Sequence, residues 1–207
     1  MKKVILAAAT FFCMGAVVAQ KKTNDVHFGL RAGANFANII KDGDNNFSTE
    51  IKPGFNAAAF LEIPIVNGFS VQPEVQFSQK GYKATGSVLG TPYDYRVTTN
   101  YVEVPLLAKL SPTPAFGIVV GPQFSFLTST NTKFKTNNSV YENTVNQDND
   151  NLRKNILGGV LGIEIASGGA VFSLRYSLDF QTNNGDGTSS TPKYKNQVLG
   201  VSVGVRL

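Results

Sequence analysis

The sequence predicts an all-β fold, an eight-stranded antiparallel up-and-down transmembrane β-barrel with a polar lumen and an apolar exterior. Three observations lead to this fold. Apolar and polar residues alternate with period two in several segments, the connections alternate between short and long, and opposite charges balance on the polar face. No stretch after residue 20 is apolar for long enough to form a transmembrane helix.

Alternation is clearest in residues 27–38, 69–80 and 171–181, where bulky apolar residues occupy every second position. In the first of these, Phe28, Leu30 and Phe36 share one face, and Arg31 takes the other. Five further segments give weaker signals. The eight strands are expected at 27–38, 53–65, 69–80, 100–110, 115–128, 155–166, 171–181 and 196–207.

The connections between these segments alternate in length. Three are short: the tight-turn sequence Val66-Asn67-Gly68, SPTP at 111–114 and SGG at 167–169. The long ones are polar and fall at 39–52, 81–99, 129–154 and 182–195. An up-and-down sheet with this pattern gathers all short turns at one end and all long loops at the other. That is the layout of outer-membrane barrels, with short periplasmic turns and longer external loops.

The segment YVEVPLLAKL, residues 101–110, shows why one face must be internal. Glu103 and Lys109 interrupt an apolar run and, having the same parity, point to the same side of an extended strand. Six residues, or about 20 Å, separate them, so each needs a partner from another strand. Candidate partners are Arg31, Lys80 or Arg175 for Glu103, and Glu62, Glu74 or Glu164 for Lys109.

Charge on the polar face distinguishes two kinds of barrel. A secreted lipocalin-like barrel is apolar inside, whereas an outer-membrane barrel is polar inside. An eight-stranded barrel is just filled by its side chains, so internal charges must be paired. Five basic and five acidic residues fall on the polar parity, which favours an internal network: Arg31, Glu62, Glu74, Lys80, Glu103, Lys109, Glu164, Arg175, Asp179 and Arg206.

Four pairs of glycines, each pair spaced by four residues, fall at positions that point inward. They leave room for long charged side chains in a narrow lumen. The pairs are Gly29 and Gly33, Gly117 and Gly121, Gly158 and Gly162, and Gly200 and Gly204.

The apolar face carries phenylalanines eight residues apart in each strand that runs toward the loop end. Eight residues climb about 20 Å in a tilted strand, close to the height of a lipid-facing band edged by aromatic girdles. The pairs are Phe28 and Phe36, Phe69 and Phe77, Phe116 and Phe124, and Phe172 and Phe180. Leu207 ends the chain on this apolar face.

Two groups of residues depart from the pattern. Apolar residues on the inward parity should either pack within the lumen or signal a bulge. They are Phe60, Leu107, Val119, Leu127 and Val160. Four prolines interrupt strand ladders and indicate further bulges: Pro64, Pro73, Pro105 and Pro122.

The N-terminus has the features of a secretory signal peptide. Lys2 and Lys3 precede an apolar stretch that ends in a small-residue cleavage site, which predicts a signal over 1–19 and a barrel domain over 20–207. Cys13, the one cysteine, lies within the signal, so the mature chain has no disulfide. Its mature charge is near +3, with no basic run interleaved with aromatics, and this argues against nucleic-acid binding.

Taken together, these residues resemble the PorT-like, porin-family outer-membrane β-barrel domain of the Bacteroidota. The resemblance spans nearly the whole mature chain and is most specific in YVEVPLLAKL, followed by GIVVGPQFSFL. It implies an eight-stranded barrel in the outer membrane of a Gram-negative bacterium. It implies little about activity.

Catalytic and metal-binding patterns are sparse. The single histidine, His27, is expected at the short-turn end, and a pair among Glu74, Glu103 and Glu164 is better explained by salt bridges. The loop sequences at 42–46 and 146–151 are rich in oxygen ligands but do not fit the EF-hand spacing. We therefore expect neither a cofactor nor a bound metal.

Three functions remain open from sequence. The first is a non-enzymatic barrel in contact with outer-membrane lipid, whose four external loops bind ligands or envelope and secretion proteins. The second is a small-barrel enzyme acting on lipid or peptide. The third is a soluble lipocalin-like carrier.

Overall fold

The computed structural model describes residues 25–41, 48–88, 91–136, 139–146, 152–185 and 193–207. The described part forms one antiparallel sheet of nine strands. Their bounds are β1 His27–Lys41, β2 Lys52–Val66, β3 Phe69–Val88, β4 Thr91–Thr113, β5 Phe116–Thr136, β6 Ser139–Asn146, β7 Asn155–Ser167, β8 Ala170–Asp179 and β9 Tyr194–Arg206. The predicted signal peptide lies outside the described residues.

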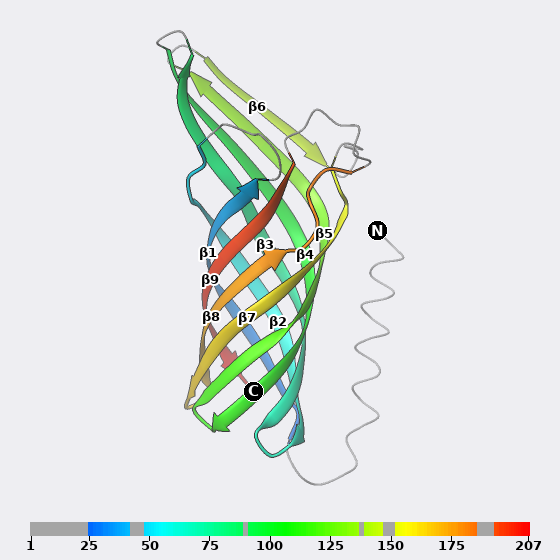
Figure 1. Cartoon of the computed structure of the whole chain (residues 1–207). Coiled ribbons are helices and arrows are strands. Elements are labelled where there is room, and N and C mark those ends of the chain that lie inside the picture. Colours follow the sequence, from blue (N-terminus) through cyan, green and yellow to red (C-terminus); the bar gives the residue numbers. More distant parts are fainter. Residues whose placement is uncertain (1–24, 42–47, 89–90, 137–138, 147–151, 186–192) are drawn as a thin grey trace.

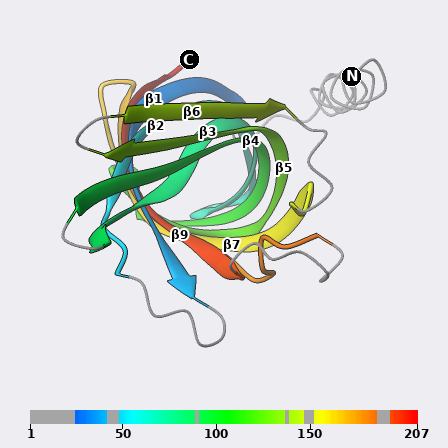
Figure 2. The same cartoon turned by 90° about the horizontal axis from the view of Figure 1, so that it is seen from above.

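Eight of the nine strands close into a ring, which confirms the predicted barrel (Figures 1 and 2). Each strand of the ring pairs with its neighbour in the chain, apart from β5, which skips β6 and pairs with β7. The pairing of β1 with β9 completes the ring. Tight turns and the C-terminus gather at one end, and Gly68, with φ 77°, supplies the left-handed residue that the β2–β3 turn requires.

The loop end differs from the expectation. Residues 81–99 and 129–154 were expected to be loops, but β3, β4 and β5 continue far past the ring and β6 pairs with the extension of β5. These strands form an external sheet, which we define as residues 81–88, 91–100, 129–136 and β6 (Figure 1). Alternation does persist there, as in Tyr93, Tyr95 and Val97, but the polar composition hides it.

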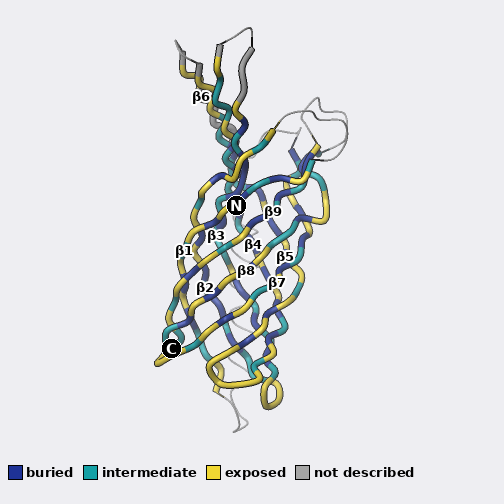
Figure 3. Tube along the Cα trace, turned by 60° about the vertical axis from the view of Figure 1, so that its left-hand side comes forward, coloured by how far each residue is buried: buried dark blue, intermediate teal, exposed yellow. Residues whose placement is uncertain are grey.

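Side chains alternate between a buried lumen and an exposed outer wall along the ring strands (Figure 3). On β9, for example, Leu199, Val201 and Val203 are 44–53% exposed, whereas Ser202 is 8% exposed. The outer wall is therefore apolar and the interior polar, the arrangement of an outer-membrane barrel. A lipocalin-like barrel has the opposite polarity, so that alternative is wrong.

The eight phenylalanines expected in girdles all lie on the outer wall. Phe36, Phe116, Phe124, Phe172 and Phe180 are exposed, and Phe28, Phe69 and Phe77 are partly exposed. Whether they mark the edges of the lipid band remains a prediction.

Both groups of departures are resolved. The five apolar residues of inward parity are all buried, and Leu107, Val119 and Val160 pack together in the lumen. Of the four prolines, only Pro64 lies at a register shift; the ladders pass Pro73, Pro105 and Pro122 in constant register, so the bulges expected there are absent. Each strand can omit one ladder hydrogen bond without inserting a residue.

Candidate functional site

The lumen contains a large ion-pair cluster, which extends from mid-height toward the short-turn end. Its members are Arg31, Glu62, Glu74, Lys109, Glu164, Arg175 and Arg206. They come from seven different ring strands, which brings distant parts of the sequence together. All are buried except Arg206, whose side chain is 27% exposed near the short-turn end.

Glu74 lies at the centre of this large cluster. Arg31 donates to both of its carboxylate oxygens, at 3.0 and 2.6 Å, and Arg175 donates to the same two oxygens, at 2.9 and 2.8 Å. Gln72 adds a further hydrogen bond at 2.8 Å. Two bidentate guanidinium contacts on one carboxylate satisfy its acceptor sites and hold all three side chains in one geometry.

The chain of ion pairs continues toward the short-turn end through Glu164. Arg175 also donates to Glu164, and the Lys109 ammonium lies 2.9 Å from its second oxygen. Lys109 then contacts Glu62 at 3.0 Å, and Arg206 reaches the same carboxylate at 3.4 Å. Lys109 is thus bound by two of its three candidate partners.

A small ion-pair cluster of Lys80, Glu103 and Asp179 lies nearer the loop end. The Lys80 ammonium is 2.8 Å from Glu103 and 3.0 Å from Asp179, and all three side chains are 1% exposed. Asn196 donates to Asp179 at 2.7 Å, and Ser125 donates to Glu103 at 3.1 Å. Lys80 is therefore the cationic partner of Glu103.

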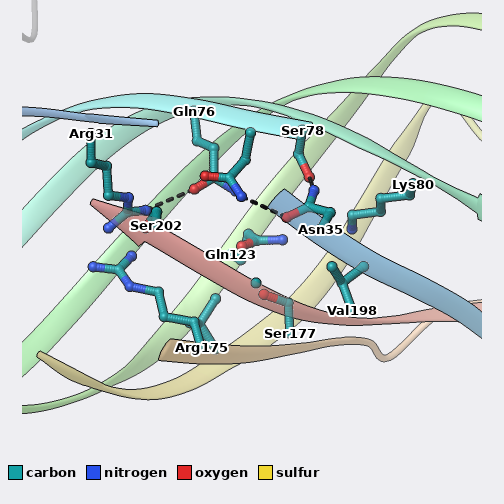
Figure 4. Close-up of a pocket in the computed structure, with 13 residues that line it drawn as sticks. Arg31, Asn35, Gln76, Ser78, Lys80, Gln123, Arg175, Ser177, Val198 and Ser202 are labelled. Atoms are coloured by element: carbon teal, nitrogen blue, oxygen red, sulfur yellow. Dashed lines mark hydrogen bonds between the residues drawn. The ribbon is translucent and has the colours of Figure 1, made fainter. Parts of the chain in front are cut away.

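Neither cluster is neutral by itself. The large cluster has four cations and three carboxylates, whereas the small one has one cation and two carboxylates. Gln76 connects them: its amide oxygen accepts from Arg31 at 2.7 Å (Figure 4), and its amide nitrogen donates to Glu103 at 2.9 Å. The side chain thus orients its dipole between a positive and a negative cluster, and the two clusters together contain five cations and five carboxylates.

Several inward glycines make room for these charged side chains. A Cβ atom on Gly162 would lie 2.7 Å from Cγ of Arg175, and one on Gly117 would lie 2.8 Å from Cε of Lys109. A Cβ on Gly204 would lie 2.6 Å from Cβ of Arg31. No side chain larger than hydrogen fits these positions unless the cluster moves.

Little free space remains inside. The cavity at mid-height measures about 20 Å³ and is lined by polar residues that include Arg31, Gln76, Lys80 and Arg175 (Figure 4). This volume holds about one water molecule. The described lumen therefore contains no continuous aqueous path at this level.

Apolar side chains close the lumen above the small cluster. Tyr82 and Tyr194 pack edge to face, with ring centroids 5.3 Å apart, and Ile39 and Val97 pack with them. A second buried group places Tyr101 beside Leu127, Leu152 and Ile156. At the opposite end, a polar depression of about 570 Å³ opens between the short turns, and His27 and Glu62 are part of its wall.

The external sheet presents two chemically different faces. Tyr95, Phe134 and Tyr141 are register neighbours on one face, and Tyr93 stacks on Phe134 with centroids 6.0 Å apart. Lys83, Arg96 and Lys133 are register neighbours on the other.

Asp94 lies on this basic face and forms an ion pair with Arg96 at 2.7 Å. Hydrogen bonds from Arg96 hold the pKa of the Asp94 carboxyl below its usual value. The pair is largely exposed, so it contributes little to stability.

Metal-binding groups do not gather within the described residues. No group of three or more His, Cys, Asp and Glu side chains in that part could hold a metal ion. The acidic loop sequence at 42–46 lies outside the described part, as does nearly all of that at 146–151. No helix in the described part has the length and apolar character needed to cross a membrane.

Sequence reasoning overlooked the neutral members of the lumen network. Gln72, Gln76, Ser125 and Asn196 all bond to its carboxylates. Gln72 and Gln76 have the same parity as Glu74, so strand alternation was sufficient to find them. Parity alone, however, does not single out neutral side chains as partners of buried charges.

Comparison with known proteins agrees with this architecture. The family described as outer membrane protein beta-barrel domain matches residues 18–185. Ail, the attachment invasion locus protein of Yersinia pestis, is 12% identical, with a TM-score of 0.50 over 89% of this chain and 100% of that one. Neisserial surface protein A is also 12% identical, with a TM-score of 0.51 over the same shares. These two likenesses concern the fold alone, and no curated protein matches the chain.

Proposed function

Because this chain belongs to the family of outer membrane protein beta-barrel domains, we propose that it is a closed anchor in the outer membrane that displays an external binding surface. Its role is interaction or envelope assembly, and its ligands are outer-membrane lipid around the ring and external molecules or envelope proteins at the loop end.

The filled lumen carries this proposal. Ten charged residues in two connected clusters occupy it, the mid-height cavity has room for about one water molecule, and apolar side chains close it toward the loops. Opening such a lumen would break buried ion pairs, which is strongly destabilising. A diffusive pore is therefore disfavoured, and the exposed features at the loop end are the remaining candidates for function.

A non-enzymatic role is part of the proposal. The carboxylates considered for catalysis, Glu74, Glu103 and Glu164, are each bound to a cation and are 3% exposed or less. His27 lines the depression at the short-turn end, far along the barrel from the external sheet. A general base needs access to substrate, which the three carboxylates lack.

Export and lineage complete the proposal. Residues 1–19 act as a cleaved signal peptide and residues 20–207 form the barrel domain of a Gram-negative bacterium. Within the family, the segments YVEVPLLAKL and GIVVGPQFSFL favour the PorT-like group of the Bacteroidota. The short turns then face the periplasm, and the external sheet faces outward.

Conductance of the purified protein tests the closed lumen. After insertion into planar bilayers, the protein should give no discrete single-channel steps above the bare membrane. Reproducible steps at a fixed conductance would refute a closed anchor.

In-cell photo-crosslinking tests the binding role. A photoreactive residue at Tyr141, on the external sheet, should capture specific proteins or glycans, whereas one at lipid-facing Leu161 should give only lipid adducts. Identical products at the two positions would contradict an external binding surface.

A further inference from the structure

One edge of the external sheet lacks a neighbour. β6 is the last strand in the sheet order and pairs only with β5, over all eight of its residues and without a register shift. Its other edge has no strand partner among the described residues. Such an edge presents a row of backbone N–H and C=O groups that can pair with another chain.

Most of the usual protection of an edge strand is missing from β6, whose one charged residue is Glu142. Its sequence, SVYENTVN, contains no proline, lysine or arginine, and its ladder contains no bulge. Val140 and Tyr141 on this strand are 64% and 66% exposed.

The opposite edge of the same sheet is protected. Glu50 bridges to Lys83 of β3 through two backbone hydrogen bonds, at 2.8 and 3.3 Å, and accepts a third from the Thr85 hydroxyl at 2.6 Å. In addition, Gly81 has a φ of 127°, which interrupts the regular geometry of that edge. The contrast between the two edges singles out β6.

We propose that β6 binds an extended segment of another protein, which adds to the external sheet as a further strand. This inference rests on the proposed external binding function and specifies its partner class. Backbone hydrogen bonds would supply affinity, and alternate side chains of the added strand would supply selectivity. The position beside Tyr141 favours an apolar side chain, because Tyr141 continues the row formed by Tyr95 and Phe134.

A second copy in the same membrane does not fit this edge. Two copies related by a two-fold axis form a symmetric ladder from their identical edges only if the two strands run antiparallel. Copies in one membrane stand the same way up, so both β6 strands run toward the membrane (Figure 1). The partner is therefore a different polypeptide, approaching from outside.

Selection of peptides tests the proposal. The full chain in lipid nanodiscs is panned against phage-displayed random 12-residue peptides, with empty nanodiscs for counter-selection. The enriched peptides should alternate apolar and polar residues. Synthetic copies should bind the protein, and copies with N-methylated backbones should bind at least about tenfold more weakly.

Proline variants locate the bound strand. Backbone groups of successive residues point to opposite sides, so either Asn143 or Thr144 directs its N–H at the free edge. Both Asn143→Pro and Thr144→Pro are made. The variant in which the amides of β5 stay protected from hydrogen exchange has its proline at the free edge, and we call it the edge variant. Alanine at the same position is its matched control. The edge proline should weaken peptide binding about tenfold, and the alanine should not.

The outcomes are distinct. If peptides bind the edge-proline variant and the parent equally, or tolerate N-methylation, the β6 proposal is wrong while external binding stands. If no peptide is enriched over empty nanodiscs, the β6 proposal is also wrong. The broader binding function is then decided by crosslinking from Tyr141.

Discussion

Replacing Lys80 by methionine should be among the most damaging single changes in the lumen. Methionine keeps an apolar stem of similar length but leaves Glu103 and Asp179 buried without their cation. At an effective dielectric constant of 20, a charge pair about 3 Å apart is worth about 5–6 kcal/mol before desolvation. Lys80 makes two such contacts, at 2.8 and 3.0 Å, and also lies 5.1 Å from the ring centre of Tyr101.

The net effect is smaller, because the substitution also removes the cost of desolvating the Lys80 ammonium on folding. Breaking a buried ion pair by removing one partner costs about 3–5 kcal/mol, and we expect that loss in the free energy of unfolding. Removing the carboxylates as well, in the Lys80→Met, Glu103→Gln, Asp179→Asn variant, should restore part of the stability, since no charge is then left unpaired.

Urea unfolding in lipid vesicles, followed by far-ultraviolet circular dichroism at constant pH, measures this effect. The matched control is Arg96→Met, which removes the cation of the exposed ion pair with Asp94 and should cost at most about 1 kcal/mol. If Lys80→Met costs no more than Arg96→Met, the charges of the lumen are not held as buried pairs and the reasoning fails.

Three further substitutions test other parts of the structure by the same unfolding measurement. Gln76→Met removes two hydrogen bonds to charged groups and should cost about 2–4 kcal/mol; a cost near zero would mean that the two clusters are independent. Gly162→Ala should cost about 1–3 kcal/mol, because the new Cβ would lie 2.6 Å from a backbone oxygen. Gly200→Ala, whose Cβ would have its nearest neighbour at 3.3 Å, should cost less. Equal costs would argue against a tightly packed wall. Leu161→Arg places a charge on the outer wall and should cost about 2–4 kcal/mol. Tyr141→Arg, on the external sheet, should change the stability little. If the stability of Leu161→Arg equals that of the parent, Leu161 does not contact lipid.

Strand alternation was enough to predict the barrel and the inward direction of its charges. Glu103 and Lys109 have the same parity in one strand, so any barrel built from that strand turns both to the same side. Their actual partners depend on how strands far apart in the sequence are staggered around the ring. Lys80 and Asp179, for instance, are separated by 99 positions. Parity alone contains no information about that stagger.

The part of the external sheet that belongs to β5 escaped prediction for a further reason. Between β4 and β5 the register shifts next to Tyr101, which pairs with Leu127, while Asn100 pairs with Ser129. Thr128 is the extra residue, so the inward parity of β5 changes from odd numbers to even ones. A pattern that changes phase within a polar segment looks like a loop. The shift becomes visible only when the neighbouring strand is in place.

The length of β4 gives the molecule a mechanical property. Its 23 residues run from the short-turn end to the tip of the external sheet as one strand, about 75 Å at full extension. β3 and β5 accompany it over most of that distance. A pull on the tip would load many ladder hydrogen bonds in shear at once rather than peel them one by one. A tether attached at β6 would thus transmit tension through the ladders of β5 and β4 into the membrane-embedded wall.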